Sequence, residues 1–230
     1  MAVSVDTVYQ RVLAILNKEQ RGYVTPQEFN LFANQALMDI FEQYFYDINQ
    51  FSRMHGNDTE YSDMLNVLNE KISLFEKQST LAFVSSAFTL PSDLYRLGTI
   101  IYNNIEAERV NKNEYLYITS SPITAPSADF PIYTKDAGGV RVFANTELNG
   151  TATVKCNYIK KPAKVVWNYR IVFGEPLYNA STSVDFELHP SDETELVIKI
   201  LELAGLLIKD ISMYQIANQE EAETIQQEKL

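Results

Sequence analysis

The strongest constraint on the fold is the segment from residue 27 to residue 55, which contains neither glycine nor proline. Its apolar residues recur at helical spacing between residues 29 and 48. Its start carries several helix-start signals. Thr25 can cap the helix, Pro26 takes the first helical position, and Glu28 completes a capping box. Val24 and Phe29 occupy the hydrophobic-staple positions. We therefore predict one helix of roughly 40 Å, at about 1.5 Å per residue. Such a helix braces a bundle or spans a subunit interface.

Helical patterns continue at both ends of the chain, and strand patterns occupy its middle. Residues 80–91 predict a hairpin-like extended segment, and residues 153–158 alternate as a half-buried strand does. The sequence thus predicts an α+β fold. Helices from residues 1–79 and 191–230 form a bundle in this fold, and residues 80–190 form an inserted β-rich domain.

A proline-rich stretch lies inside the predicted insertion. Pro122, Pro126 and Pro131 fall within residues 119–133, where they exclude a regular helix. We expect an extended surface arm there.

The densest group of candidate catalytic or metal-binding residues is DFELHPSDE, which begins at Asp185. On a strand, Asp185, Glu187 and His189 share one face, but Asp185 and His189 lie roughly 13 Å apart at about 3.3 Å per residue. Zinc ligands sit about 2 Å from the metal, so those two cannot share an ion. Glu187 and His189 remain a candidate pair, which would need a third ligand from elsewhere in the fold.

A structural interpretation explains the same acids. Ser191 is a good helix cap, and Asp192, Glu193 and Glu195 fill a first turn, where the helix dipole favours negative charge. The helix that follows is apolar on most sides, which predicts burial in the bundle. We therefore favour a joint between a strand and a buried helix over a metal or acid–base site.

The rest of the sequence carries no catalytic signature. It has no GxGxxG, P-loop, GxSxG, HExxH or EF-hand motif. Cys156 is the single cysteine and takes an inward strand position, and His55 falls near the end of the long helix. We predict a protein that is not an enzyme and that holds no cofactor and no metal.

The charge is acidic and unevenly distributed. The net charge is −11, with −5 over residues 1–80, +2 over residues 81–180 and −8 over residues 181–230. This balance argues against ordinary nucleic-acid binding, which needs a basic face. It is compatible with neighbouring subunits that meet basic region to acidic region.

A basic run at residues 155–170 leaves other contacts open. Its lysines and arginine interleave with Tyr158, Trp167 and Tyr169, as in surfaces that touch nucleic acid. There are two alternatives. The lysines could protect an edge strand from aggregation, or the run could contact another protein.

The chain lacks the marks of export. No apolar run reaches the roughly 20 residues that a membrane helix needs. The N-terminus has no basic segment and no small-residue cleavage site, so we expect no signal peptide. We expect a soluble protein made in a reducing cytoplasm.

Aromatic residues suggest contacts with other chains. The sequence has 14 tyrosines, and tyrosine is enriched at interfaces because it joins apolar area to a polar tip. We predict a subunit or partner interface that uses residues of the arm, the basic run and the segment after it: Tyr115, Tyr117, Pro122, Pro126, Tyr133, Lys160, Lys161, Trp167, Tyr169 and Tyr178.

Several segments, in this order, carry a resemblance to a known family: VTPQEFNLFANQA, TLPSDLYRLGTIIY, SSPITAPSADFPIYT, VKCNYIKKPAKVVWNY and DFELHPSDETELVIKILELAGLLIKD. Over roughly residues 20–220 they resemble virion structural proteins of tailed bacteriophages, crAss-like phages in particular. Among these, the chain looks like the head-to-tail connectors, also called adaptor or ring proteins, which stack beneath the portal. The resemblance rests on the residue patterns and the order of these segments rather than on a catalytic motif.

The resemblance implies a homo-oligomeric ring of about twelve copies around a DNA channel in the phage neck. Its partners would be the portal protein above and other neck or tail proteins below, with passive contact to DNA during ejection and no membrane. The protein would be made in the bacterial host and end in the virion. The alternatives are another tail or hub component, or a small metal-dependent hydrolase that uses Glu187 and His189.

Overall fold

The structure is a computed structural model that describes residues 3–18, 24–53 and 59–208. The chain divides into two compact units, a helical unit of Met1–Leu74 with Pro162–Leu230 and a sheet unit of Phe75–Lys161. The sheet unit is thus inserted between helices from the two ends of the chain, and the predicted α+β fold is confirmed. The expected insertion over residues 80–190 is too long, because residues 162–190 belong to the helical unit.

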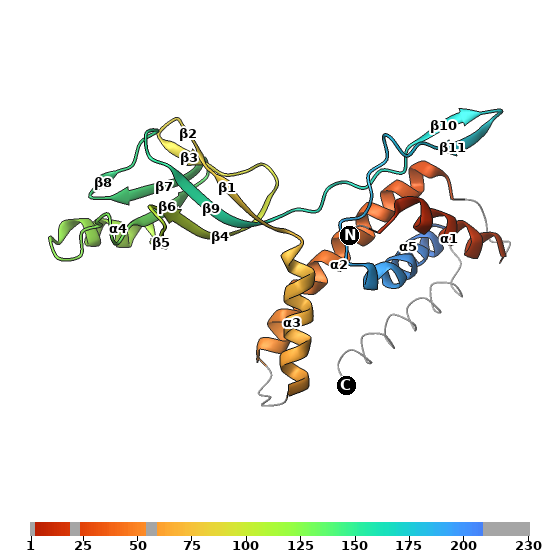
Figure 1. The fold of residues 1–230 in the computed structure, drawn as a ribbon, viewed down its shortest axis with the longest axis horizontal. Helices are drawn as coiled ribbons and strands as arrows, with labels where there is room; N and C mark the ends of the chain where they lie inside the picture. The colour runs from red at the N-terminus through yellow and green to blue at the C-terminus, as the bar shows by residue number, and fades with distance from the viewer. Residues whose placement is uncertain (1–2, 19–23, 54–58, 209–230) are drawn as a thin grey trace. The chain divides into compact units, whose positions relative to one another are not determined.

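The described part of the helical unit contains four α-helices: α1 (Val5–Lys18), α2 (Pro26–Arg53), α3 (Thr59–Ser73) and α5 (Glu193–Ile208), as Figure 1 shows. α2 packs against both α3 and α5, and α1 packs against α5. The side chains between them are apolar and buried: Val8, Val12, Leu16, Phe29, Ala33, Leu37, Ile40, Phe41, Leu68, Ile72, Leu196, Ile200 and Ala204. None of the described helices is long and apolar enough to cross a membrane. His55 and residues 209–230 lie outside the described residues.

The start of α2 has the predicted capping box. Glu28 Oε2 accepts hydrogen bonds from the Thr25 backbone nitrogen at 2.9 Å and from its hydroxyl at 2.7 Å. The Thr25 hydroxyl accepts one from the Glu28 backbone nitrogen at 3.3 Å. The hydrogen bonds from the Thr25 side chain and backbone hold the pKa of Glu28 below its ordinary value. The box is therefore charged at neutral pH and weakens only as the pH falls through that lowered pKa.

The start of α5 differs from the expectation. Ser191 does not cap the helix but lies inside a short 3₁₀ turn, η1 (Pro190–Asp192), that leads into α5. The capping residue is His189, whose Nδ1 accepts a hydrogen bond from the Ser191 backbone nitrogen at 3.3 Å. Proline suits the first helical position because it has no N–H to leave unpaired, so the residue before Pro190 becomes the cap.

The sheet unit contains nine strands in one sheet. They are β1 (Glu76–Thr80), β2 (Ala82–Val84), β3 (Ala87–Thr89), β4 (Leu94–Tyr102), β5 (Ile105–Arg109), β6 (Ile132–Asp136), β7 (Gly139–Ala144), β8 (Thr146–Glu147) and β9 (Val154–Lys160). The order is β1-β9-β4-β5-β6-β7-β3-β2, with β8 paired to β7. Its buried core includes Phe88, Ile100, Tyr133, Val140, Val142, Val154 and Cys156. The predicted hairpin at residues 80–91 is β2–β3, and the alternation over residues 153–158 is β9.

One strand pair needs a long connection. β5 and β6 are parallel, whereas the other paired strands of the sheet are antiparallel. Parallel neighbours cannot be joined by a tight turn. The chain between them forms a helix, α4 (Lys112–Ser120), and then an irregular loop over residues 121–131.

The loop is folded rather than extended, so the predicted extended arm is wrong. The Ala125 backbone nitrogen donates to the Ser121 carbonyl at 3.0 Å, and the Asn145 backbone nitrogen donates to the Pro126 carbonyl at 3.0 Å. No helix crosses residues 121–131, as the prolines predict, but turns bring the chain back on itself.

Tight turns join two of the antiparallel pairs. Ser85 and Ser86 have φ of 50° and 69° between β2 and β3, and Asn103 and Asn104 have φ of 49° and 61° between β4 and β5. Two positive φ values in a two-residue loop match the twist of a hairpin. Both turns use small polar residues, which tolerate this left-handed backbone.

Candidate protein-interaction site

Asp185 and Glu187, the two acids of the candidate site, accept hydrogen bonds from backbone nitrogens. Asp185 Oδ1 accepts from the Val5 nitrogen at the start of α1 at 2.9 Å, and Glu187 Oε2 accepts from the Ala163 nitrogen at 2.9 Å. His189 caps the turn before α5. Among the described residues, no three His, Cys, Asp or Glu side chains are grouped to hold a metal. The expected structural joint thus accounts for these side chains.

Cys156 gives no nucleophile. It is buried within the sheet, and burial raises the pKa of its thiol. The reactive form of cysteine is the thiolate, so a raised pKa keeps the group unreactive at neutral pH. The inward strand position predicted for it is confirmed.

Asparagines of α2 anchor the chain after the sheet unit. Asn34 pairs with both backbone groups of Val165, accepting from its nitrogen at 3.0 Å and donating to its carbonyl at 2.8 Å. Asn30 pairs in the same way with Trp167, at 2.7 Å and 3.2 Å. The two side chains, one helical turn apart, pair with this segment as a neighbouring strand would.

An aromatic cluster sits on this anchor. The Trp167 ring centroid lies 4.3 Å from that of Tyr9, and 5.7 Å from those of Tyr169 and Tyr178, which stack on it. Trp167 Nε1 donates to Asp6 Oδ1 at 2.9 Å. Trp167 is only 2% exposed, so its predicted role in a partner interface is wrong. The half-buried Tyr169 and Tyr178 fix the segment that follows instead.

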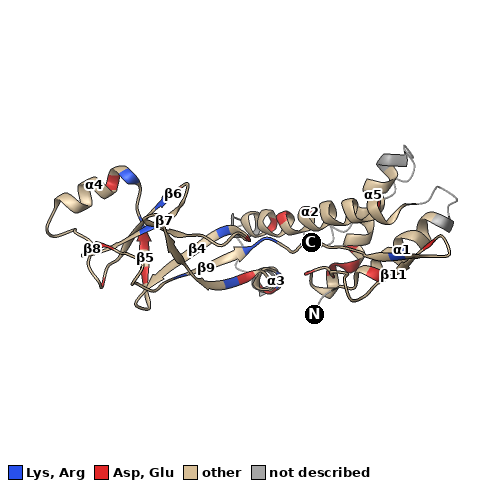
Figure 2. Cartoon of the chain, turned by 90° about the horizontal axis from the view of Figure 1, so that it is seen from above, with Lys and Arg blue, Asp and Glu red and all other residues tan. Residues whose placement is uncertain are grey.

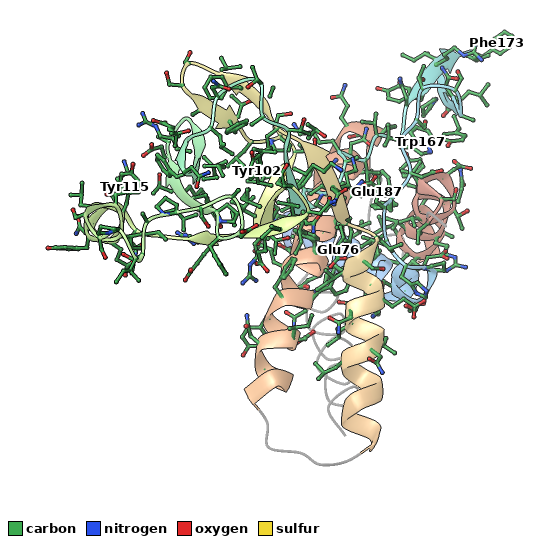
Figure 3. All side chains as sticks on the ribbon, turned by 60° about the vertical axis from the view of Figure 1, so that its left-hand side comes forward. Glu76, Tyr102, Tyr115, Trp167, Phe173 and Glu187 are labelled. Carbon is green, nitrogen blue, oxygen red and sulfur yellow. The ribbon has the colours of Figure 1, made fainter. Side chains whose placement is uncertain are left out.

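That segment is a two-stranded hairpin, β10 (Tyr169–Val172) and β11 (Glu175–Tyr178). Figure 3 shows Trp167 at its base and Phe173 at its far end. Its apolar side chains are open to solvent: Ile171 at 73%, Val172 at 41%, Phe173 at 104% and Leu177 at 55% exposure. We call these four residues the hairpin tip. Exposed apolar groups of this kind mark interaction sites.

The sheet unit has a second exposed apolar surface. On α4, the Tyr115 ring is tilted against the Phe143 ring, with centroids 4.4 Å apart, and Ile118 packs beside it, so Tyr115 and Ile118 face the core. The other exposed apolar side chains of α4 and its loop define what we call the α4 surface: Leu116 at 64%, Tyr117 at 78%, Ile123 at 95% and Phe130 at 78% exposure. Charges on α4 are confined to its first turn, at Lys112 and Glu114 (Figure 2).

The predicted interface residues are divided by the structure. Tyr117, Pro122 and Lys161 are exposed and available to a partner. Tyr133 is 5% exposed because β6 lies inside the sheet, so it is not available. Tyr115, Pro126 and Lys160 are half-buried. The basic run at 155–170 is divided between the units: residues 155–161 belong to the sheet unit and residues 162–170 to the helical unit.

Truncating the anchor should destabilise the helical unit. We expect Asn34→Ala to lower the free energy of unfolding by about 1–3 kcal/mol, because buried Val165 would keep a backbone donor and acceptor without partners. Urea unfolding followed by the fluorescence of Trp167, the single tryptophan, measures the loss. The matched control is Gln35→Ala on the same helix, which removes only an exposed hydrogen bond to Asp39 at 2.8 Å. Equal losses in both variants would contradict the anchoring role.

Comparison with known proteins supplies no further assignment. No protein-family model matches the sequence, and no curated protein matches it. The fold and surfaces define an α+β protein of two units, each with an exposed apolar surface on a firmly held support.

Proposed function

We propose that the chain is a structural virion protein that forms a ring in the neck of a tailed phage, between portal and tail, around the DNA channel. The observation that supports this best is the pair of apolar surfaces on separate units, the hairpin tip and the α4 surface. Two different surfaces on one chain allow a heterologous contact, in which each copy binds two neighbours. Contacts of this type generate rings when the rotation closes.

The charge of the chain is consistent with a DNA conduit. Residues 1–74 with 162–230 carry 10 basic and 22 acidic side chains, whereas residues 75–161 carry 9 and 8. An acidic wall would repel the phosphate backbone and let DNA slide without binding. Contact with DNA is thus passive in this proposal, and the candidate acids Asp185 and Glu187 act in folding rather than catalysis.

Native mass spectrometry and negative-stain imaging test the ring. We expect closed rings of about twelve copies, free in solution or assembled on portal-bearing heads. A strict monomer in both settings, which binds stoichiometric metal and loses a hydrolytic activity in Glu187→Ala, would exclude the ring and favour the hydrolase. Binding to tails and not to heads would favour the tail or hub component.

A further inference from the structure

We propose that the β10–β11 hairpin of one copy binds the α4 surface of the next copy. This inference rests on the proposed function, because it identifies the subunit contact of the ring. The five most exposed large apolar side chains of the described residues are Phe173 at 104%, Ile123 at 95%, Tyr117 and Phe130 at 78%, and Ile171 at 73%. All five belong to the hairpin tip or to the α4 surface. Covering each surface with the other therefore removes the largest apolar exposure among the described side chains.

The strained backbone at the turn of the hairpin favours a contact between Phe173 and a second copy. Phe173 has φ of 52°, in the left-handed region, and is followed by Gly174 with φ of 89°. At the corresponding turn positions the chain uses Ser85 and Asn103. A bulky residue with positive φ is an outlier that costs on the order of 1–3 kcal/mol. Because Phe173 is fully exposed, burial within its own chain does not offset this cost. A contact made by the aromatic ring with a second copy would offset it.

Both surfaces are held in place before they meet. The hairpin is fixed at its base by the stack of Tyr169 and Tyr178 on Trp167. α4 is fixed by Tyr115 against Phe143 and by an ion pair between Lys112 and Asp136. Surfaces that are already ordered lose less conformational entropy on binding. An exposed apolar surface that is held rigid in this way is what a binding contact needs.

Size and charge fit a second copy as the occupant. Aromatic side chains bury about 150–250 Å² each, so three aromatic and five aliphatic side chains together approach the roughly 1,000 Å² that a specific interface needs. Arg170 precedes the tip and Asp129 precedes Phe130, and both are exposed. Neither has an ion-pair partner among the described residues. The hairpin also carries Glu175, which is exposed too, so only Arg170 among its charges is opposite in sign to Asp129.

Cysteine cross-linking tests the contact directly. Full-length chains with Leu177→Cys are mixed with mass-tagged chains carrying Leu116→Cys and are oxidised, so that Phe173 and Tyr117 stay in place. We expect about tenfold more mixed dimer than with chains carrying Leu31→Cys, a control at an exposed apolar residue of α2, as an aromatic anchor predicts. The native Cys156 is 0% exposed and stays out of the reaction. Equal yields from Leu116→Cys and Leu31→Cys, or no mixed dimer, would overturn the inference.

Phe173→Asn separates binding from folding. Asparagine suits the left-handed turn, so we expect an unchanged or higher melting temperature together with self-association weakened by about tenfold or more. A purely structural role for Phe173 predicts a lower melting temperature instead. Arg170→Asp and Asp129→Arg should each weaken association, and the chain that carries both should recover it. A lack of recovery would reject this ion pair.

The outcomes also separate this contact from the ring itself. Rings that persist in Phe173→Asn, without mixed dimer, would overturn the hairpin contact and leave the proposed function standing. Mixed dimer in chains that form only dimers or open filaments would support the contact and exclude the ring. Phe173→Asn chains that lose binding to portal-bearing heads, while the cysteine pair gives no mixed dimer, would assign the hairpin to another protein and overturn the inference.

Discussion

Replacing Asp192 with alanine is expected to lower the free energy of unfolding of the helical unit by about 3–5 kcal/mol, the usual cost of breaking a buried ion pair. Asp192 is 2% exposed. Its Oδ1 lies 2.7 Å from Lys71 Nζ, and its Oδ2 accepts a hydrogen bond from the Tyr44 hydroxyl at 2.6 Å. These residues come from η1, α3 and α2, so one carboxylate joins three elements of the bundle.

The loss is large because of what the alanine variant leaves behind. The Lys71 side chain is 14% exposed, and its Nζ lies 5.5 Å from the centre of the Tyr44 ring. Without the carboxylate its ammonium group would remain largely buried and without its counter-charge. Domains are typically stable by about 5–15 kcal/mol, so Asp192→Ala would leave the helical unit close to unfolding.

Two further variants isolate the cause. Asp192→Leu combined with Lys71→Met removes both charges and should regain most of the stability, because a buried ion pair can often be replaced by apolar residues. Arg11→Ala is the control at a pair that is open to solvent on the Arg11 side, with half-buried Glu193 at 2.9 Å, and it should cost only about 1 kcal/mol. Urea unfolding followed by Trp167 fluorescence measures all three. A loss in Asp192→Ala no greater than in Arg11→Ala would show that the cluster does not stabilise the bundle.

The helices could be predicted because their signals are local. The capping box at Thr25 and Glu28 fixes the start of α2, and the regular spacing of apolar residues fixes its buried face. The same reasoning applied to Pro190 would have identified His189 as the cap of η1. The acidic residues after Ser191 instead favoured Ser191 as the cap, which is wrong. The burial of Asp192 could not be predicted, because it depends on Lys71, which is distant in the sequence.

Two elements were missed because tertiary packing outweighs local propensity. α4 contains Tyr115, Tyr117, Ile118 and Thr119, residue types that favour strands. Its capping-box pattern, in which Glu114 accepts from the Asn111 nitrogen at 3.1 Å, was the available signal. The β10–β11 hairpin has an analogous signal, a glycine in a two-residue loop between apolar strand residues.

The interface prediction identified the right kind of residue but not its orientation. Tyr117 is exposed and Tyr133 is buried, although both are tyrosines near the proline-rich stretch. Which side a tyrosine faces depends on strand order and on the crossover between β5 and β6, which one sequence does not reveal. Phe173 and Ile123 were missed because large apolar residues are normally assigned to the core.

Gly139→Ala is expected to destabilise the sheet unit by about 3 kcal/mol or more, because backbone strain and steric overlap act together. Gly139 begins β7 with φ of 146°, a conformation that residues with a side chain rarely adopt. A Cβ atom there would lie 2.2 Å from the Phe88 carbonyl oxygen. The neighbouring pair Phe88 and Val140 links β3 to β7, and both are buried in the core. To accommodate the methyl group, backbone must move at this junction.

Gly138→Ala is the matched control for this prediction. A Cβ atom on Gly138 meets nothing within 4 Å, so the variant should be neutral or gain up to about 1 kcal/mol from a less flexible unfolded chain. Hydrogen exchange over β3 and β7 distinguishes the two variants. Gly139→Ala should exchange about a hundredfold faster, since each 1.4 kcal/mol corresponds to about a tenfold change. Similar protection in both variants would mean that β3 can move away from β7 at little cost. The β3–β7 pairing would then contribute little to the stability of the unit that carries the α4 surface.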